Sequence, residues 1–418
     1  MRNFAVLMNY HVFTLSNGLR VIHRHDASPV VYCGLGINAG SRDEAPGDEG
    51  LAHCCEHVSF KGTSRRRACH TINSLERVGG DLNAFTNKED TVYYSAILRD
   101  HLPRAVDLLT DIVLHSTYPQ AEIDREAEVI ADEIESYNDS PAELIFDEFE
   151  NMVFKGHPLG HNILGNTQRL RQFGTADALR FTRRHYVPQN MAFFAYGDIC
   201  FDRLVRLLEK ATADFPSAEP LVPDLEVKSA GLPPLVGGQT EMARGTHQAH
   251  VMLGNRAYGI HSDKRMALYL LNNILGGPGM NAHLNLSLRE RRGLVYTVES
   301  SMVNYSDTGA WCVYFGCDHH HVSRCLRLVR SELDKLASKP LTPSQLSAAK
   351  RQLKGQIGVA CDAREGFALS FGKSFLHYGW ERDVERLFQS IDNVTSEQIL
   401  SVAQEVFNPE QLTTLVFR

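Results

Sequence analysis

One five-residue segment constrains the fold of this 418-residue chain more than any other feature: residues 53–57, which read His-Cys-Cys-Glu-His. The pattern H-x-x-E-H is the inverted form of the helical metalloprotease motif. On a helix, two histidines four positions apart share one face and lie about 6 Å apart, so both imidazoles can reach one metal ion. Glu56 projects beside them and can take a proton from a metal-bound water. The motif therefore predicts a helix over residues 50–60 that carries part of a zinc hydrolase site.

This pattern has an alternative explanation, because the chain contains 19 histidines and short patterns also occur by chance. The alternative is a buried amphipathic helix whose histidines are satisfied by hydrogen bonds. Zinc in a hydrolase usually takes three protein ligands plus water, so a third ligand elsewhere favours the metal site. Residues 122–135 form a helical pattern in which Glu126 and Glu133 share a face that borders an apolar stripe. The other glutamates of this stretch are expected to be solvated.

The motifs that follow these histidines have a characteristic order and spacing. Phe-Lys-Gly-Thr occupies residues 60–63, and residues 79–84 read G-G-x-x-N-A. Glu133 lies 76 positions after His57. This combination resembles the zinc peptidases of the pitrilysin and mitochondrial processing peptidase family, whose metal glutamate follows the last histidine by about this interval. The resemblance covers nearly the whole chain.

The resemblance implies a role for each residue of the predicted site. His53, His57 and Glu133 would bind one Zn²⁺ per chain, although such a ligand set also suits manganese or cobalt. Glu56 would be the general base. Glu126 would be a carboxylate outside the ligand set that orients one of the ligands.

Two further sets of residues are expected to contact the substrate. A helix that ends at Gly293 is followed by a strand, so Arg289 and Tyr296 are expected to converge across the turn. By the family resemblance, this pair grips the substrate backbone near the scissile bond and stabilises the developing oxyanion. The resemblance also places Asn83 and Ala84 on an edge strand that pairs with an extended substrate. The alternative is an ordinary edge strand whose asparagine caps a turn.

The second half of the sequence repeats the order of the first. For example, Asp90-Thr91 precedes a strand, as Asp307-Thr308 does later. The repeat predicts an α+β fold of two homologous halves, each a mixed sheet with helices packed on one face; the alternative is chance similarity. Residues 215–238 contain five prolines and read as a linker. We therefore expect a catalytic zinc-binding domain over residues 1–225 and a degenerate second domain over residues 226–418.

Charge and hydropathy exclude two classes of partner. The net charge of −7 and the pI of about 6.3 argue against nucleic acid. No apolar stretch approaches the length of a membrane span, and the N-terminus lacks a signal-peptide pattern. The run His319–His321 is interpreted as a solvated turn, with a second metal site as the alternative.

The nine cysteines indicate a reducing compartment, because their number is odd and their spacing fits no disulfide framework. We expect the cytoplasm of a bacterium-like cell. Cys54 and Cys55 depart from the family pattern, which has bulky apolar residues at these positions. Cysteine buries readily, so the pair is expected to face the core. Metal ligation by their thiolates is the alternative.

These features together predict a zinc endopeptidase that cleaves extended or unfolded peptides. Family members of this length enclose the substrate in a chamber made by two chains, so the resemblance implies a homodimer. In such a dimer, the Arg–Tyr pair of one chain faces the zinc of its partner. Two alternatives are a non-catalytic partner subunit and a metal-dependent peptide-binding protein with little turnover.

Overall fold

The computed structural model describes residues 10–215, 231–235, 237–379 and 383–418. The chain forms two compact units. Unit 1 comprises Met1–Glu135, His161–Ala230 and Cys361–Asp383, and unit 2 comprises the remaining segments. The domain boundary expected near residue 225 lies outside the described residues.

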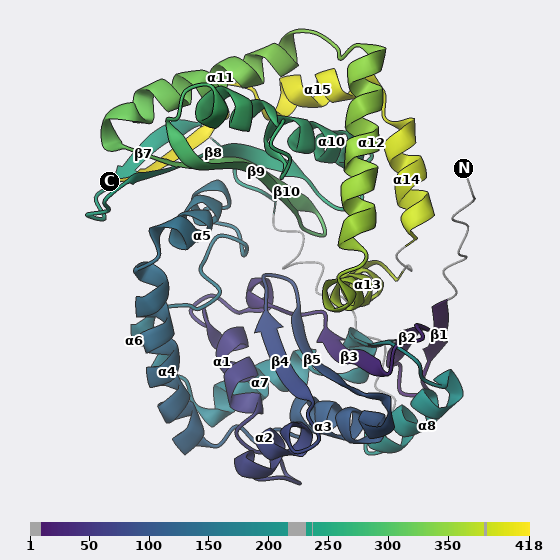
Figure 1. The fold of residues 1–418 in the computed structure, drawn as a ribbon. Helices are drawn as coiled ribbons and strands as arrows, with labels where there is room; N and C mark the ends of the chain where they lie inside the picture. The colour runs from purple at the N-terminus through teal and green to yellow at the C-terminus, as the bar shows by residue number, and fades with distance from the viewer. Residues whose placement is uncertain (1–9, 216–230, 236, 380–382) are drawn as a thin grey trace. The chain divides into compact units, whose positions relative to one another are not determined.

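Unit 1 is built on a six-stranded mixed sheet (Figure 1). The strand order is β1-β2-β6-β3-β5-β4, in which only β2 and β6 pair in parallel. The strands are β1 (Tyr10–Thr14), β2 (Arg20–Arg24), β3 (Val30–Ile37), β4 (Asp81–Thr86), β5 (Thr91–Leu98) and β6 (Met191–Tyr196).

Both faces of this sheet are covered, as β6 shows most clearly. Its six residues, Met-Ala-Phe-Phe-Ala-Tyr, are all buried. Side chains alternate along a strand, so Phe193 packs into a core on one face and Phe194 into a second core on the other. Helix α13 (Arg364–Tyr378) supplies the second core, and it comes so close that a Cβ atom at Gly372 would lie 2.6 Å from the Phe194 ring.

The larger core of unit 1 lies between the other face of the sheet and several helices. Its members include Leu35, Val58, Leu109 and Ile130, all fully buried. The helices with residues in unit 1, besides α13, are α1 (Leu51–Ser59), α2 (Ala68–Glu76), α3 (Leu102–Leu114), α4 (Gln120–Asn138), α6 (Thr167–Leu170), α7 (Thr175–His185) and α8 (Phe201–Ala211). The last turn of α4 belongs to unit 2.

Unit 2 has a five-stranded mixed sheet with the order β7-β11-β8-β10-β9. Again one pair, β7 and β11, is parallel and the others are antiparallel. The strands are β7 (Gly238–Met242), β8 (Ala249–Tyr258), β9 (Val295–Asn304), β10 (Thr308–Cys317) and β11 (Thr413–Phe417). The order and directions match those of β2-β6-β3-β5-β4 in unit 1, as a duplicated fold requires. The predicted α+β fold of two related halves is therefore confirmed.

The second sheet is also covered on both faces. Along β10, Cys312 packs against α5 (Pro141–Val153), while the neighbouring Trp311 packs on the opposite face against Phe407. The other helices of unit 2 are α10 (Arg265–Gly276), α11 (Val322–Ser338), α12 (Pro343–Ala360), α14 (Val384–Asn393) and α15 (Ser396–Val406). The sequence predicted helices on one face of each sheet, but a helix also covers the second face. These helices are α13 in unit 1 and α5 in unit 2, and each comes from the opposite half of the sequence.

The helices of the described residues include none with the length and apolar character needed to cross a membrane.

Candidate metal centre

Helix α1 carries the H-x-x-E-H motif, and its N-terminus is tightly fixed. Gly50 precedes the helix with φ near 97°, a backbone conformation that favours glycine. A Cβ atom there would lie 2.9 Å from the Cα of Gly165, so the position also needs glycine for space. The buried carboxylate of Glu44 accepts hydrogen bonds from the N–H groups of Gly50 and Ala52 at 3.1 and 2.8 Å. Glu44 therefore caps a helix whose first N–H groups would otherwise lack partners.

The histidines of α1 meet one glutamate of α4. The Nε2 atoms of His53 and His57 lie 3.9 and 3.5 Å from the same carboxylate oxygen of Glu133. One potential ligand atom from each residue lies within 4.8 Å of those of the other two. In Figure 1, α1 lies between β4 and α4, and this position brings residues 76 positions apart into one cluster.

This cluster fits a zinc ion. Tetrahedral coordination with bonds of about 2.0–2.1 Å places donor atoms about 3.3 Å apart, close to the observed 3.5 and 3.9 Å. Burial, together with a smaller effect from the nearby His57, lowers the pKa of His53 to about 3. A neutral imidazole keeps the lone pair that a metal needs. The Glu133 side chain is partly exposed, so the cluster is open to solvent on that side. Water or substrate could approach from there.

A second carboxylate of α4 fixes the ring of His57. Glu126 is buried and lies 3.2 Å from His57 Nδ1. Its other oxygen lies 2.8 Å from Lys61 Nζ, which balances its charge. An acceptor on Nδ1 places the proton there and leaves Nε2 free to face Glu133. Lys61 belongs to the Phe-Lys-Gly-Thr motif, but the sequence did not indicate this contact.

Glu56 lies next to the cluster but outside it. Its carboxylate is buried and accepts a 2.6 Å hydrogen bond from the hydroxyl of Thr86. Burial raises the pKa of Glu56, whereas the hydrogen bond from Thr86 and the proximity of His57 act in the opposite direction. Thr86 ends β4, three residues after Asn83. No sequence motif marks Thr86, although it lies on the strand that was expected to bind the substrate.

Cys54 and Cys55 are both buried among apolar side chains of unit 1. Burial raises the pKa of Cys54 to about 12 and that of Cys55 well above its usual value. Cysteine binds a metal as the thiolate, and burial disfavours the thiolate form at both positions. The pair therefore faces the core, as expected from the sequence.

The expected substrate-binding strand lies at an edge of its sheet. Asn83 and Ala84 pair with Tyr94 and Tyr93 of β5, and β4 is the last strand in the sheet order. The opposite side of β4 has no neighbouring strand among the described residues, and Asn83 is exposed.

Arg289 and Tyr296 converge in unit 2, as expected from the turn at Gly293. The guanidinium of Arg289 lies 5.6 Å from the centre of the Tyr296 ring. Arg289 lies in the last turn of a π-helical segment, Asn285–Glu290, and Tyr296 lies at the start of β9. The Tyr296 side chain is 81% exposed, which leaves its hydroxyl available to a ligand.

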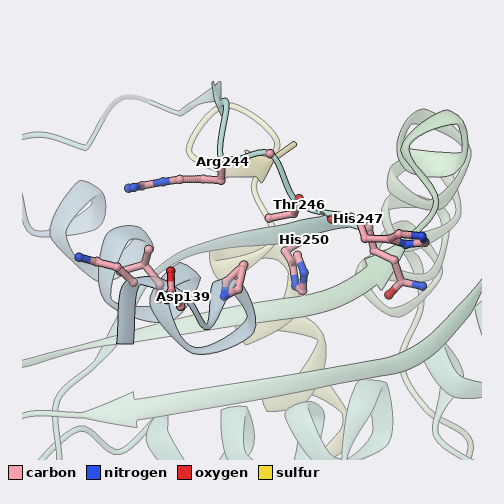
Figure 2. A pocket seen from close by; sticks show the side chains of 10 residues that line it. Asp139, Arg244, Thr246, His247 and His250 are labelled. Carbon is pink, nitrogen blue, oxygen red and sulfur yellow. Dashed lines mark hydrogen bonds between the residues drawn. The ribbon is translucent and has the colours of Figure 1, made fainter. Parts of the chain in front are cut away.

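Unit 2 also contains a pocket of about 690 Å³ that none of the predicted site residues lines. Figure 2 shows that Arg244, Thr246, His247 and His250 lie along one side and that Asp139 approaches from the turn between α4 and α5. Its lining contains both positively and negatively charged side chains, so it does not indicate one class of ligand.

The cap on α1 leads to a prediction. Replacing Glu44 by Gln should lower the free energy of unfolding by about 1–3 kcal/mol, because an amide NH₂ would face the backbone N–H groups or His161, which lies 2.9 Å from the carboxylate. Chemical denaturation of the metal-free protein measures the loss. The control is Glu49→Gln, a partly exposed carboxylate in the same loop, with an expected change within about 0.5 kcal/mol. Equal losses in the two variants would show that Glu44 does not hold α1.

Known proteins match this chain along nearly its full length. Residues 20–167 match the family described as insulinase (peptidase family M16), and residues 173–353 match the peptidase M16 inactive domain. An uncharacterized zinc protease of Streptomyces coelicolor is 35% identical over 405 residues, which cover 94% of this chain and 86% of the relative. An uncharacterized zinc protease of Mycobacterium tuberculosis is 33% identical, with 94% and 90% covered. One of Bacillus subtilis is 28% identical, with 97% of each covered.

Solved structures show the same fold. A protease from Helicobacter pylori superposes with a TM-score of 0.88 at 21% identity, covering 99% of this chain and 100% of that one. A structure described as a peptidase M16 inactive domain from Pseudomonas fluorescens has a TM-score of 0.85 at 20% identity, with 98% and 97% covered.

Proposed function

Since this chain belongs to the insulinase family of peptidases (family M16) and is a zinc metallopeptidase, we propose that it is an endopeptidase for extended or unfolded peptides. The observation that carries this proposal is the cluster of His53, His57 and Glu133, with the buried carboxylate of Glu56 beside it. The two imidazoles and the carboxylate would bind one zinc ion per chain. When bound, zinc supplies a Lewis acid for a water molecule and for the peptide carbonyl.

Glu56 would transfer the protons of the reaction, and the residues around it would hold the reacting groups in place. Glu56 takes a proton from the attacking water and gives it to the leaving amine. The raised pKa of Glu56 suits both transfers, because an acid–base group works best when its pKa lies nearer to the pH of the reaction. The hydroxyl of Thr86 holds the Glu56 carboxylate in place through its hydrogen bond. Glu126 keeps the ring of His57 oriented, and the ion pair with Lys61 holds Glu126 in place.

The open edge of β4 would bind the substrate as an added strand. Backbone pairing at Asn83 and Ala84 requires an extended peptide and depends little on its side chains, which favours unfolded substrates. Arg289 and Tyr296 would stabilise the negative charge that develops on the carbonyl oxygen. We propose that they act on the zinc site of a partner chain, within a chamber formed by a homodimer.

The cysteines support a proposal for the cellular compartment. All nine are free, and five of them, Cys33, Cys54, Cys55, Cys317 and Cys325, are buried to 1% exposure or less. Free thiols suit a reducing compartment, and we propose the cytoplasm. The acidic net charge supports peptides over nucleic acid as the partner.

Cleavage of a mixed peptide library, with parallel metal analysis, tests the function. We expect internal cleavage of peptides that stops with a chelator and returns with zinc. Binding of peptides without cleavage would favour a peptide-binding protein. Cleavage that is insensitive to the chelator would remove the metal from the reaction.

The shared site can be tested by mixing two inactive chains. We expect Arg289→Ala and Glu56→Gln chains, when co-expressed, to regain about a quarter of the wild-type activity. Random pairing makes about half of the dimers mixed, and each mixed dimer has one complete site. Peptide cleavage per chain is the measurement.

The control mixes Arg289→Ala with the double variant Glu56→Gln/Arg289→Ala, which offers no complete site and should stay inactive. If the first mixture recovers no more activity than this control, the two residues act on the zinc of their own chain.

A further inference from the structure

We propose a second metal site in unit 2, formed by Asp318, His320 and His321 at the turn between β10 and α11. It would take a borderline divalent cation such as Zn²⁺, Cu²⁺ or Ni²⁺. One potential ligand atom from each of the three residues lies within 4.8 Å of those of the other two. The proposal does not depend on the peptidase reaction, because none of these residues belongs to the site around His53.

The backbone of the turn brings the three side chains together. After β10, residues His319–His321 form one turn of 3₁₀ helix that leads into α11. The N–H of His321 donates to the carbonyl oxygen of Asp318 at 2.8 Å. In a 3₁₀ turn the side chains at positions i and i+3 eclipse each other, so Asp318 and His321 project from the same side. The ring of His320 packs on that of His321, with ring centres 3.9 Å apart.

The remaining histidine of the run is directed elsewhere. His319 Nε2 lies 3.0 Å from the carbonyl oxygen of Thr246, a residue that lines the pocket in Figure 2. This contact fixes the turn against the loop that follows β7 and separates His319 from the proposed ligands. The run of three histidines therefore contains two proposed ligands and one residue that supports the turn.

The donor set decides the class of metal. Two imidazoles and one carboxylate suit Zn²⁺, Cu²⁺ or Ni²⁺, whereas Ca²⁺ and Mg²⁺ prefer oxygen ligands throughout. The described part of the chain shows no ion pair that engages Asp318, His320 or His321. Arg418 contacts the carbonyl oxygen of His319, and its charge is balanced by Glu241.

Two factors make this site weaker than the one on α1. Asp318 and His320 are exposed, so binding must order mobile side chains and draw the donors closer together. The positive end of the α11 dipole also opposes a cation, although the Asp318 carboxylate offsets this effect. We therefore expect the second site to fill only at micromolar free metal.

Zinc titration of the untagged, chelator-stripped chain tests the proposal, with zinc per chain measured after equilibrium dialysis. We expect two equivalents, one bound at nanomolar and one at micromolar free zinc. The double variant His320→Ala/His321→Ala should lose only the weaker equivalent and keep peptide cleavage. The matched control, His319→Ala, removes a histidine of the same run and should keep both.

Three results would overturn the site. They are a single equivalent in the wild type up to high micromolar zinc, a second equivalent that survives in the double variant, and a loss in His319→Ala as large as that in the double variant. His57→Ala separates this proposal from the proposed function, because it should lose the tight equivalent and keep the weak one. Circular dichroism of the double variant should match that of the wild type, as expected if the turn residues are not needed for folding.

Discussion

Replacing Glu56 by Gln is expected to lower kcat for peptide cleavage by about 10²–10⁴-fold, the usual worth of a general base. The amide keeps the size of the side chain and still offers an oxygen to the Thr86 hydroxyl, but it cannot accept the proton from water. Glu56 lies outside the cluster of potential ligand atoms, so zinc binding should remain at one tight equivalent per chain. Steady-state kinetics with a library-derived peptide and metal analysis of the same sample provide the two measurements.

A matched control separates this effect from a general change in charge. Glu135 lies two residues after Glu133 on α4 and is exposed, so Glu135→Gln should leave both activity and zinc unchanged. Near-full activity in Glu56→Gln would remove Glu56 from the mechanism. Loss of zinc in that variant would instead make Glu56 a metal ligand.

The local features of this site could be predicted from the sequence because they depend on short-range geometry. Helical spacing alone places His53 and His57 on one face, and the heptad interval does the same for Glu126 and Glu133. That these two faces meet was an expectation from family resemblance, since no periodicity reveals which helices pack together. The 3.5 Å separation between His57 and Glu133 shows the meeting directly.

The supporting contacts could not be predicted in the same way. Glu44 caps α1 from six to eight residues upstream, and Thr86 reaches Glu56 from a strand 30 positions away. Ordinary glutamates and threonines have no pattern that indicates such contacts. Their roles follow from the tertiary packing that leaves each buried polar group with a partner.

The sequence pattern also could not predict that each sheet is covered by a helix from the opposite half of the chain. The sequence repeat predicted one sheet in each half of the chain, with helices on one face of each sheet. A strand such as β6, in which all six residues are apolar, already indicates a sheet covered on both faces. It does not indicate which helix covers the second face. The structure assigns α13 to unit 1 and α5 to unit 2, each from the opposite half of the sequence.

The other large effect is expected from His57→Ala, which should abolish tight zinc binding and, with it, peptide cleavage. The variant removes one of three potential ligands and also releases Glu126 from its contact with Nδ1. Two remaining ligands leave zinc with too few protein donors for a hydrolase site. Zinc per chain is measured in a metal buffer at nanomolar free zinc, where the weaker site on unit 2 stays empty.

The control for this variant is His70→Ala, because His70 is an exposed histidine on the neighbouring helix α2. It should keep one tight equivalent and full activity, so a general loss of histidine cannot explain the result. A full equivalent retained by His57→Ala at nanomolar zinc would contradict the ligand assignment. The same outcome with Glu133→Gln would show that the α4 carboxylate lies near the metal without binding it, and the tight site would then need a different third ligand.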